Sequence, residues 1–261
     1  PSVSDRTLRG ITRPRLVVFK PDRPNGAGVL LIPGGGYRHV VVDNEGYEMA
    51  RWLAARGFTA FVLFYRLPGD GWQAGPDVAL ADAQRAIRSI RNHAPRFALD
   101  PERVGCMGFS AGGHLCASLS TRFASRVYDP VDPSDALSAR PFCAALIYPV
   151  VSMRAGLAHV GSRNLLIGAD ASAALENALS PDRNVPDDAP PHFLLHAEDD
   201  TAVDVENTLL MRSALRSKGI SVETHLFRDG GHGFGLRKSI GKPVESWPSL
   251  WLAWAAAIGL I

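Results

Sequence analysis

Short apolar runs alternate along the chain with segments whose apolar residues recur every third or fourth position. A near-continuous apolar run such as 58–65 is typical of a parallel strand covered on both faces, whereas the apolar stripe of 77–92 predicts a helix. We expect strands at 16–19, 29–32, 58–65, 104–107, 143–148, 192–197 and 222–227, and helices at 45–56, 77–92, 113–119, 171–179, 205–218 and around 247–254. Their alternation predicts one α/β domain over 1–261 with a central, mostly parallel sheet flanked by helices, in which the first two strands are neighbours.

The composition removes several classes of partner. Hydrophobic residues make up 46% of the 261 positions and charged residues 21%, which is ordinary for a globular protein with a sizeable core. The formal net charge of +2 gives no reason to expect nucleic acid or a membrane as a partner, and no apolar stretch approaches the roughly 20 residues that span a bilayer. Cys106, Cys116 and Cys143 lie in apolar segments, so we expect buried free thiols, and the Cys and His residues show no metal-ligand spacing.

The most informative stretch is Gly108-Phe109-Ser110-Ala111-Gly112, which ends a predicted strand and begins a predicted helix. A strand, a tight turn that carries a serine, and a helix form the context in which G-x-S-x-G acts as a nucleophile elbow. Glycines are needed on both sides because larger side chains would collide with the strand and helix that the turn joins. A chain with 25 glycines also produces such a match by chance, so the interpretation depends on what else reaches this place.

A serine, an acid and a histidine follow the carboxyl ends of three predicted strands. Ser110 follows the first, Asp200 follows 192–197, and His232 follows 222–227 within Gly-Gly-His-Gly. Because ligands and functional groups gather at the carboxyl ends of parallel strands, these side chains are expected to meet. The imidazole would take the serine proton and hand it to a leaving group, while the acid fixes its tautomer. The chain order Ser, Asp, His is that of an α/β-hydrolase.

Other acids and histidines leave alternatives open. The acids that follow the strand 192–197 are Glu198, Asp199, Asp200 and Asp204. Asp200 is favoured because it lies well out on the loop, and Asp199 is the next candidate. Among the histidines, His114 is expected to pack or hydrogen-bond beneath the serine, and His159 has no supporting signal.

The triple glycine 34–36 also follows a predicted strand. It lacks the G-x-G-x-x-G spacing and the Lys-Ser/Thr pair of a P-loop, so phosphate is disfavoured as its ligand. We expect it instead to expose backbone amides beside the serine. Gly35 and Gly36, together with Ala111, are the predicted oxyanion hole, where loss of one donor typically raises the barrier by about 3 kcal/mol.

With these residues in place, the sequence resembles the α/β-hydrolase superfamily and, within it, the carbohydrate acetyl-esterase and feruloyl-esterase-like branch. The motifs that carry the resemblance cover nearly the whole chain: Pro-Gly-Gly-Gly-Tyr at 33–37, Tyr-Arg-Leu at 65–67, Asp-Ala-Gln-Arg-Ala at 82–86, Gly-Phe-Ser-Ala-Gly-Gly-His at 108–114, Ile-Tyr-Pro at 147–149, Val-Glu-Asn at 205–207 and Gly-Gly-His-Gly at 230–233. The match implies that Asp200 is the acid. Pro33 departs from lipase-like relatives, which carry His there, and Asp204 stands where relatives tend to have Pro.

The predicted topology divides the long connections. Segment 122–141 runs from a helix to a strand, so it is expected on the face opposite the site as a solvated connection. Segment 149–191 leaves the carboxyl end of a strand and is expected as an insertion that covers the pocket. The pocket residues predicted with it are Tyr37, Arg38, His39 and Trp72.

The resemblance implies a serine esterase that forms an acyl-enzyme without metal or cofactor and acts on short-chain acyl esters, above all O-acetyl groups, of small molecules or oligosaccharides. A small peptidase of the prolyl-oligopeptidase type is the alternative enzyme, although 261 residues leave no room for its usual gating domain. A catalytically silent binding module is the alternative of another class, and the intact Ser110, Asp200 and His232 argue against it. Relatives that act on plant polysaccharides are often exported, and a chain that begins with Pro1 fits the loss of a signal peptide, although a trimmed end or a cytoplasmic protein fits too.

Overall fold

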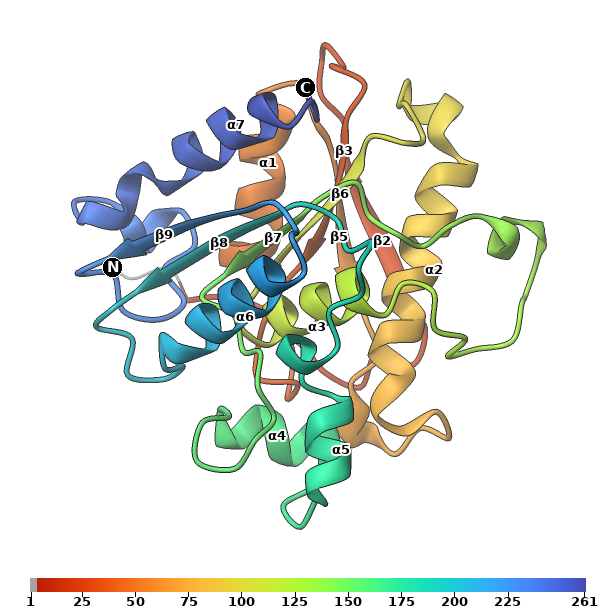
Figure 1. Ribbon diagram of the computed structural model, residues 1–261. Helices are drawn as coiled ribbons and strands as arrows, with labels where there is room; N and C mark the ends of the chain where they lie inside the picture. The colour runs from red at the N-terminus through yellow and green to blue at the C-terminus, as the bar shows by residue number, and fades with distance from the viewer. Residues whose placement is uncertain (1–3) are drawn as a thin grey trace.

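A central sheet of seven strands organises the computed structural model, which describes residues 4–261. The strand order is β2-β5-β3-β6-β7-β8-β9, and every neighbouring pair is parallel except β2 and β5 (Figure 1). The strands are β2 Arg15–Phe19, β3 Gly28–Ile32, β5 Thr59–Phe64, β6 Val104–Phe109, β7 Ala144–Ile147, β8 His192–Ala197 and β9 Val222–Phe227, and β1 Thr7–Leu8 pairs with β4 Val40–Val41 in a separate two-stranded sheet. The predicted α/β class with a mostly parallel sheet is confirmed.

Helices cover both faces of this sheet. In Figure 1, α1 and α7 lie on one face and α2, α3 and α6 on the other, while α4 and α5 project from the end at which the parallel strands finish. The helices are α1 Glu48–Ala54, α2 Val78–Asn92, α3 Ser110–Thr121, α4 Val160–Ile167, α5 Ala173–Ala178, α6 Glu206–Ser217 and α7 Trp247–Ala257. A π-helical turn, Asp43–Tyr47, precedes α1. Short 3₁₀ turns lie at Pro68–Asp70, Gly75–Asp77, Ala94–Phe97, Pro133–Ala136, Pro181–Arg183, Arg237–Ser239 and Pro243–Ser246.

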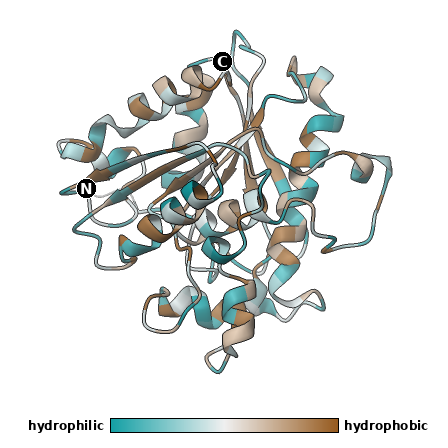
Figure 2. Ribbon diagram, in the orientation of Figure 1, coloured by the Kyte–Doolittle hydropathy of each residue, from teal (hydrophilic) through white to brown (hydrophobic). Residues whose placement is uncertain are grey.

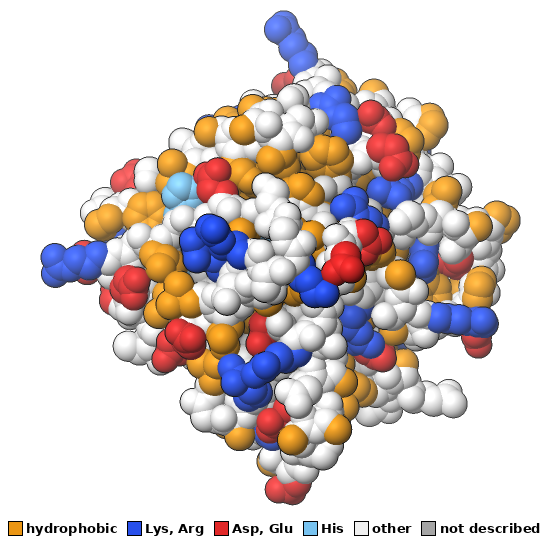
Figure 3. All heavy atoms as spheres, in the orientation of Figure 1, with side chains coloured by type: hydrophobic (Ala, Val, Ile, Leu, Met, Phe, Trp, Pro, Cys, Tyr) orange, Lys and Arg blue, Asp and Glu red, His pale blue; other side chains and the backbone are white. Residues whose placement is uncertain are grey.

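The core lies in and around the central strands. Every residue of β3, β5, β6, β7 and β8 is buried, as expected for strands covered on both faces. Figure 2 shows the central strands largely in the brown of hydrophobic residues. The three cysteines are buried and free, as predicted, and Trp247 and Trp251 pack in the same core. On the face shown in Figure 3, positive and negative side chains are interspersed. Within residues 4–261, none of the helices combines the length and apolar character needed to cross a bilayer.

The prediction that the first two strands are neighbours was wrong, because β5 lies between β2 and β3. Both edges of β3 are taken by parallel partners, β5 and β6, whose residues are all buried, like those of β3. Strand β2 begins with an exposed arginine and is only partly buried. It therefore occupies the edge of the sheet, antiparallel to β5.

The connection 122–141 is held more firmly than a solvated loop. Arg85 of α2 forms ion pairs with Asp132 and Asp135, at 2.5 and 2.8 Å. One turn further along α2, Arg88 donates to the hydroxyl of Tyr128 at 2.5 Å. These arginines of α2 therefore fasten the connection to the helix.

Candidate active site

The turn between β6 and α3 has the geometry that its glycines predict. Ser110 has a φ of 53°, in the left-handed region, directly after the extended last residue of the strand. A Cβ on Gly108 would lie 2.2 Å from the carbonyl oxygen of Gly112, and one on Gly112 would lie 2.1 Å from the carbonyl oxygen of Ile32. Neither position accepts a side chain, because the start of α3 packs closely against β6 and against the end of β3. The glycines thereby permit the strained turn that carries the serine.

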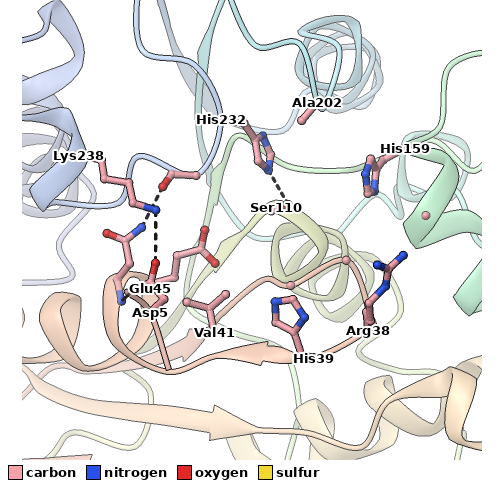
Figure 4. A pocket seen from close by; sticks show the side chains of 15 residues that line it. Asp5, Arg38, His39, Val41, Glu45, Ser110, His159, Ala202, His232 and Lys238 are labelled. Carbon is pink, nitrogen blue, oxygen red and sulfur yellow. Dashed lines mark hydrogen bonds and ion pairs between the residues drawn. The ribbon is translucent and has the colours of Figure 1, made fainter. Parts of the chain in front are cut away.

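Ser110, His232 and Asp200 form a continuous hydrogen-bond chain. The Oγ of Ser110 lies 2.8 Å from Nε2 of His232 (Figure 4), and Nδ1 of the same ring lies 2.6 Å from Oδ2 of Asp200. The three side chains follow β6, β9 and β8 respectively, at the carboxyl edge of the sheet. The structure thus brings together the three residues that the sequence analysis predicted to meet. In this arrangement the imidazole can accept the serine proton while the carboxylate holds its other nitrogen protonated.

Asp200 is surrounded by donors. Its Oδ1 accepts hydrogen bonds from the amides of Ala202 and Val203, both at 2.9 Å, and its Oδ2 accepts one from Nε2 of His196 at 3.1 Å. Burial alone would raise the pKa of Asp200, but the hydrogen bonds from His196 and His232 hold that pKa well below its usual range. The carboxylate of Asp200 is therefore ionised near neutral pH, where the imidazole would act as a base.

The other acids that follow β8 do not hydrogen-bond to His232. Asp199 accepts hydrogen bonds from the amides of Gly230 and Gly231, at 2.8 and 2.7 Å, and so holds the loop that carries His232. The side chain of Asp204 accepts an amide hydrogen bond at the start of α6, at 2.9 Å. Glu198 is exposed. Among residues 4–261, Asp200 is the one carboxylate that hydrogen-bonds to this imidazole.

The triple glycine forms a tight turn beside the serine. The carbonyl oxygen of Gly35 accepts hydrogen bonds from the amides of Arg38 and His39, at 3.0 and 3.3 Å. A Cβ on Gly35 would lie 2.2 Å from the carbonyl oxygen of His39, and its φ of 127° is one that other residues rarely adopt. No hydrogen bond within residues 4–261 uses the amides of Gly35 or Gly36, and both residues line the same pocket as Ser110. The assignment of Gly35 and Gly36 to an oxyanion hole therefore stays a prediction with which the structure is compatible.

Ala111 lies in the first turn of α3, where backbone amides have no partner within the helix. Because Ala111 follows Ser110 directly in the chain, its backbone amide lies beside the serine. The amide of Gly34, by contrast, is already taken, because it donates to Oε2 of Glu45 at 2.7 Å. The first glycine of the triplet is thus structural, and the second and third remain the candidate donors.

Glu45 is the site residue that the sequence analysis missed. It is 4% exposed, and its Oε1 accepts a hydrogen bond from the hydroxyl of Tyr148 at 3.0 Å. That hydroxyl accepts the amide of Gly235 at 3.2 Å, and the Tyr148 ring stacks edge-on against His232 with 5.0 Å between centroids. Burial raises the pKa of Glu45 in spite of these hydrogen bonds. Glu45 thereby ties the glycine turn to the loop that carries the histidine. An acid in the first turn of a predicted helix is common, so its sequence signal was weak.

An open pocket of about 570 Å³ lies over the serine. Arg38 and His39 line it, as predicted, together with His159, which the sequence analysis had set aside (Figure 4). Asp5 and Lys238 line its other end. The lining is rich in groups that can hydrogen-bond to a polar substrate.

Tyr37 and Trp72 do not line this pocket, so these two predictions were wrong. Tyr37 adopts a φ of 58° in the tight turn, which sends its side chain inward, where it is 2% exposed. Its hydroxyl lies 2.7 Å from Nδ1 of His114 beneath the serine, where His114 was expected to hydrogen-bond. Trp72 lies against Arg66, whose guanidinium carbon is 5.3 Å from the indole centroid.

Segment 149–191 contributes to the pocket through the start of α4. His159 and Gly161 both line it. The helix α4 itself was not predicted, because His159 caps it in place of the Ser, Thr, Asp or Asn that usually mark a helix start. No group of three His, Cys, Asp or Glu side chains within residues 4–261 has the arrangement of a metal site.

Comparison with known proteins gives concordant matches. The BD-FAE family model matches residues 18–215. An acetylxylan esterase of Xylanibacter ruminicola is 32% identical over 232 residues, which cover 85% of this chain but 44% of that protein. The chain therefore spans less than half the length of this curated relative.

Solved structures resemble the whole chain. The acetyl ester-xyloside bifunctional hydrolase of Caldicellulosiruptor lactoaceticus superimposes with a TM-score of 0.87 at 39% identity, covering 95% of this chain and 89% of that one. MGS-M1, an alpha/beta hydrolase enzyme from a deep-sea metagenome library of the Medee basin, superimposes with a TM-score of 0.72 at 24% identity, covering 98% and 97% of the two chains. The predicted α/β-hydrolase fold is confirmed.

Proposed function

The chain belongs to the BD-FAE family, and on that premise we propose that it is a serine carboxylesterase that removes short acyl groups, above all O-acetyl groups, from carbohydrates. The observation that carries the proposal is the hydrogen-bond chain Ser110–His232–Asp200 beside the two unpaired amides of Gly35 and Gly36. A nucleophile, its base and an oxyanion hole are what ester hydrolysis through an acyl-enzyme requires.

Each step of that reaction has a group positioned for it. The Oγ of Ser110 attacks the ester carbonyl while Nε2 of His232 takes its proton, and the carbonyl oxygen gains its negative charge beside the glycine amides. The bond to the alcohol oxygen then breaks, and the imidazolium gives its proton to that oxygen. Water, deprotonated by the same imidazole, then attacks the acyl-enzyme. As the bond between the acyl carbon and Oγ breaks, the imidazolium returns the proton to Oγ, which releases the carboxylic acid and restores the serine.

The carbohydrate substrate is supported by two findings. The relatives include proteins named for acetylxylan and acetyl ester-xyloside hydrolysis. The pocket also offers several polar side chains beyond the three reacting residues, including Arg38, His39 and Lys238, which suit a hydroxylated alcohol better than a long acyl chain.

Hydrolysis of a xyloside bond is not favoured as a second activity. Glycoside hydrolysis needs two carboxyl groups that are free to act as acid and as base or nucleophile. Of the carboxylates that line the pocket, Asp5 is held by Arg237 and Lys238, and Glu45 accepts hydrogen bonds on both of its oxygens.

Acetate release tests the proposal. Wild type, Ser110→Ala and the surface control Ser217→Ala are incubated with acetylated xylan and with p-nitrophenyl acetate. We expect wild type and the control to release acetate from both substrates, and Ser110→Ala from neither. Activity on p-nitrophenyl acetate alone would support the esterase activity and refute acetylated xylan as a substrate. If neither substrate is hydrolysed and a fluorophosphonate does not label the protein, the binding module is favoured. Cleavage of prolyl peptides would favour the peptidase.

An exported location accompanies the proposal, because polymeric xylan lies outside cells. Fractionation of the source cells tests it, and activity confined to the cytoplasm would refute it.

A further inference from the structure

His159 has a fixed tautomer because it caps a helix. It precedes α4, and its Nδ1 accepts a hydrogen bond from the amide of Ser162 at 3.2 Å. The hydroxyl of Ser162 lies 2.8 Å from the same nitrogen. A backbone amide can only donate, so Nδ1 carries the lone pair and the ring proton resides on Nε2.

The ring is also fixed in position. A Cβ on Gly161 would lie 3.2 Å from Cε1 of His159, and a Cβ on Gly36 would lie 3.8 Å from the same atom. The imidazole therefore rests between the start of α4 and the glycine turn, half-buried, and lines the same pocket as Ser110 and His232 (Figure 4). Within residues 4–261, no hydrogen bond uses its Nε2.

This histidine is a donor and not a second base. The lone pair on its ring nitrogen is engaged by Ser162, and burial lowers its pKa, which disfavours protonation of the ring. His159 lines the pocket, and its Nε2–H is unpaired among the described residues. A donor that is already held in place binds an acceptor of the substrate without the entropy cost of ordering a side chain.

We propose that His159 is a specificity residue whose Nε2–H donates a hydrogen bond to a sugar oxygen adjacent to the acylated one. The inference rests on the proposed function and names the part of the substrate that this side chain binds. An acetyl group has one strong acceptor, its carbonyl oxygen, which the amides of Gly35 and Gly36 receive. The acceptors that remain for His159 belong to the alcohol, and on a sugar the nearest are the vicinal hydroxyls.

The test pairs a variant with a substrate that lacks the acceptor. In His159→Asn the side-chain oxygen still caps α4, because Asn is a strong N-cap residue, but the ring donor is gone. Ser162→Ala is the matched control, because it leaves the amide of residue 162 to fix the tautomer. The substrates are methyl β-xyloside acetylated at O3 and its 2-deoxy and 4-deoxy analogues, with kcat/KM measured for each.

We expect the wild type and Ser162→Ala to prefer the fully hydroxylated ester over at least one deoxy analogue by about threefold to tenfold, the worth of one neutral hydrogen bond. In His159→Asn that ratio should fall to about one, whereas in Ser162→Ala both the ratio and p-nitrophenyl acetate hydrolysis should stay within about twofold of wild type. If circular dichroism shows His159→Asn unfolded, His159→Ser, which also caps, takes its place.

An unchanged preference in the variant would overturn the inference while leaving the esterase standing, and so would an equal loss on all substrates. If the wild type released no acetate from any xyloside, the proposed function itself would fail, and this inference with it.

Discussion

Replacing Asp200 by Asn should stop turnover while leaving the fold nearly intact. The carboxylate accepts the amides of Ala202 and Val203 on one oxygen and two ring nitrogens on the other. In Asp200→Asn the amide oxygen keeps the two backbone hydrogen bonds, so the NH₂ group takes the place of Oδ2. Two donors would then face each other across the 2.6 Å contact with Nδ1 of His232.

The imidazole can relieve this contact by moving its proton to Nε2. Nδ1 then accepts from the new amide, but Nε2, which lies 2.8 Å from the Oγ of Ser110, has no lone pair left for the serine proton. The same substitution in another serine hydrolase, one with a Ser-His-Asp triad, lowers kcat about ten-thousandfold. That corresponds to about 5 kcal/mol of lost transition-state stabilisation. Hydrolysis that remains would come from the oxyanion hole and substrate binding.

The assay is kcat for p-nitrophenyl acetate, with Asp199→Asn as the matched control. Asp199 accepts two backbone amides on a single oxygen, and the amide oxygen of Asn can do the same, so this variant should stay within about threefold of wild type. Circular dichroism establishes that both variants are folded. A folded Asp200→Asn with more than about a tenth of wild-type kcat, or a larger loss in Asp199→Asn, would refute the assignment of the acid.

Three further predictions concern the buried Glu45, the glycine turn and two buried histidines. Glu45→Gln places an amide donor against the hydroxyl of Tyr148 or the amide of residue 34. We therefore expect the free energy of unfolding, measured by urea titration, to fall by about 1–3 kcal/mol, and kcat to fall as well. Unchanged values would contradict the proposed link between the glycine turn and the loop that carries His232. Gly35→Ala puts a Cβ 2.2 Å from a carbonyl oxygen and should lower kcat about a hundredfold with native circular dichroism, whereas wild-type kcat would remove this turn from the oxyanion hole. Burial lowers the pKa of both His114 and His192 to about 4, so their contribution to stability is present above about pH 6.5 and is lost as the pH falls toward 4; a Tm that stays flat across that window would contradict it.

Much of the site was readable from the sequence because its parts are local. The turn around Ser110 is recognisable from the glycines on both sides of it, between a predicted strand and a predicted helix. The glycines of Gly-Gly-His-Gly identify His232 in the same way. The order of strands and helices then implies that both reach the carboxyl edge of the sheet. Asp200 needed the resemblance as well, because four acids follow one strand within seven positions.

The parts that could not be predicted depend on contacts between distant residues. Whether Tyr37 points into the pocket or into the core is decided by the left-handed backbone of one turn and by a hydrogen bond to His114. The role of Glu45 depends on its hydrogen bond from the hydroxyl of Tyr148, a residue that directly follows β7 and is distant in sequence. The edge position of β2 results from competition among strands, which no single segment encodes.

Covalent labelling of the serine tests the central claim most directly. The protein is treated with a fluorophosphonate, digested and mapped by mass spectrometry, beside Ser110→Ala and Asp200→Asn. The account predicts one adduct, on the peptide that contains Ser110, formed far more slowly in Asp200→Asn and not at all in Ser110→Ala. An active esterase whose Ser110 stays unlabelled, or whose adduct lies on another residue, would contradict it.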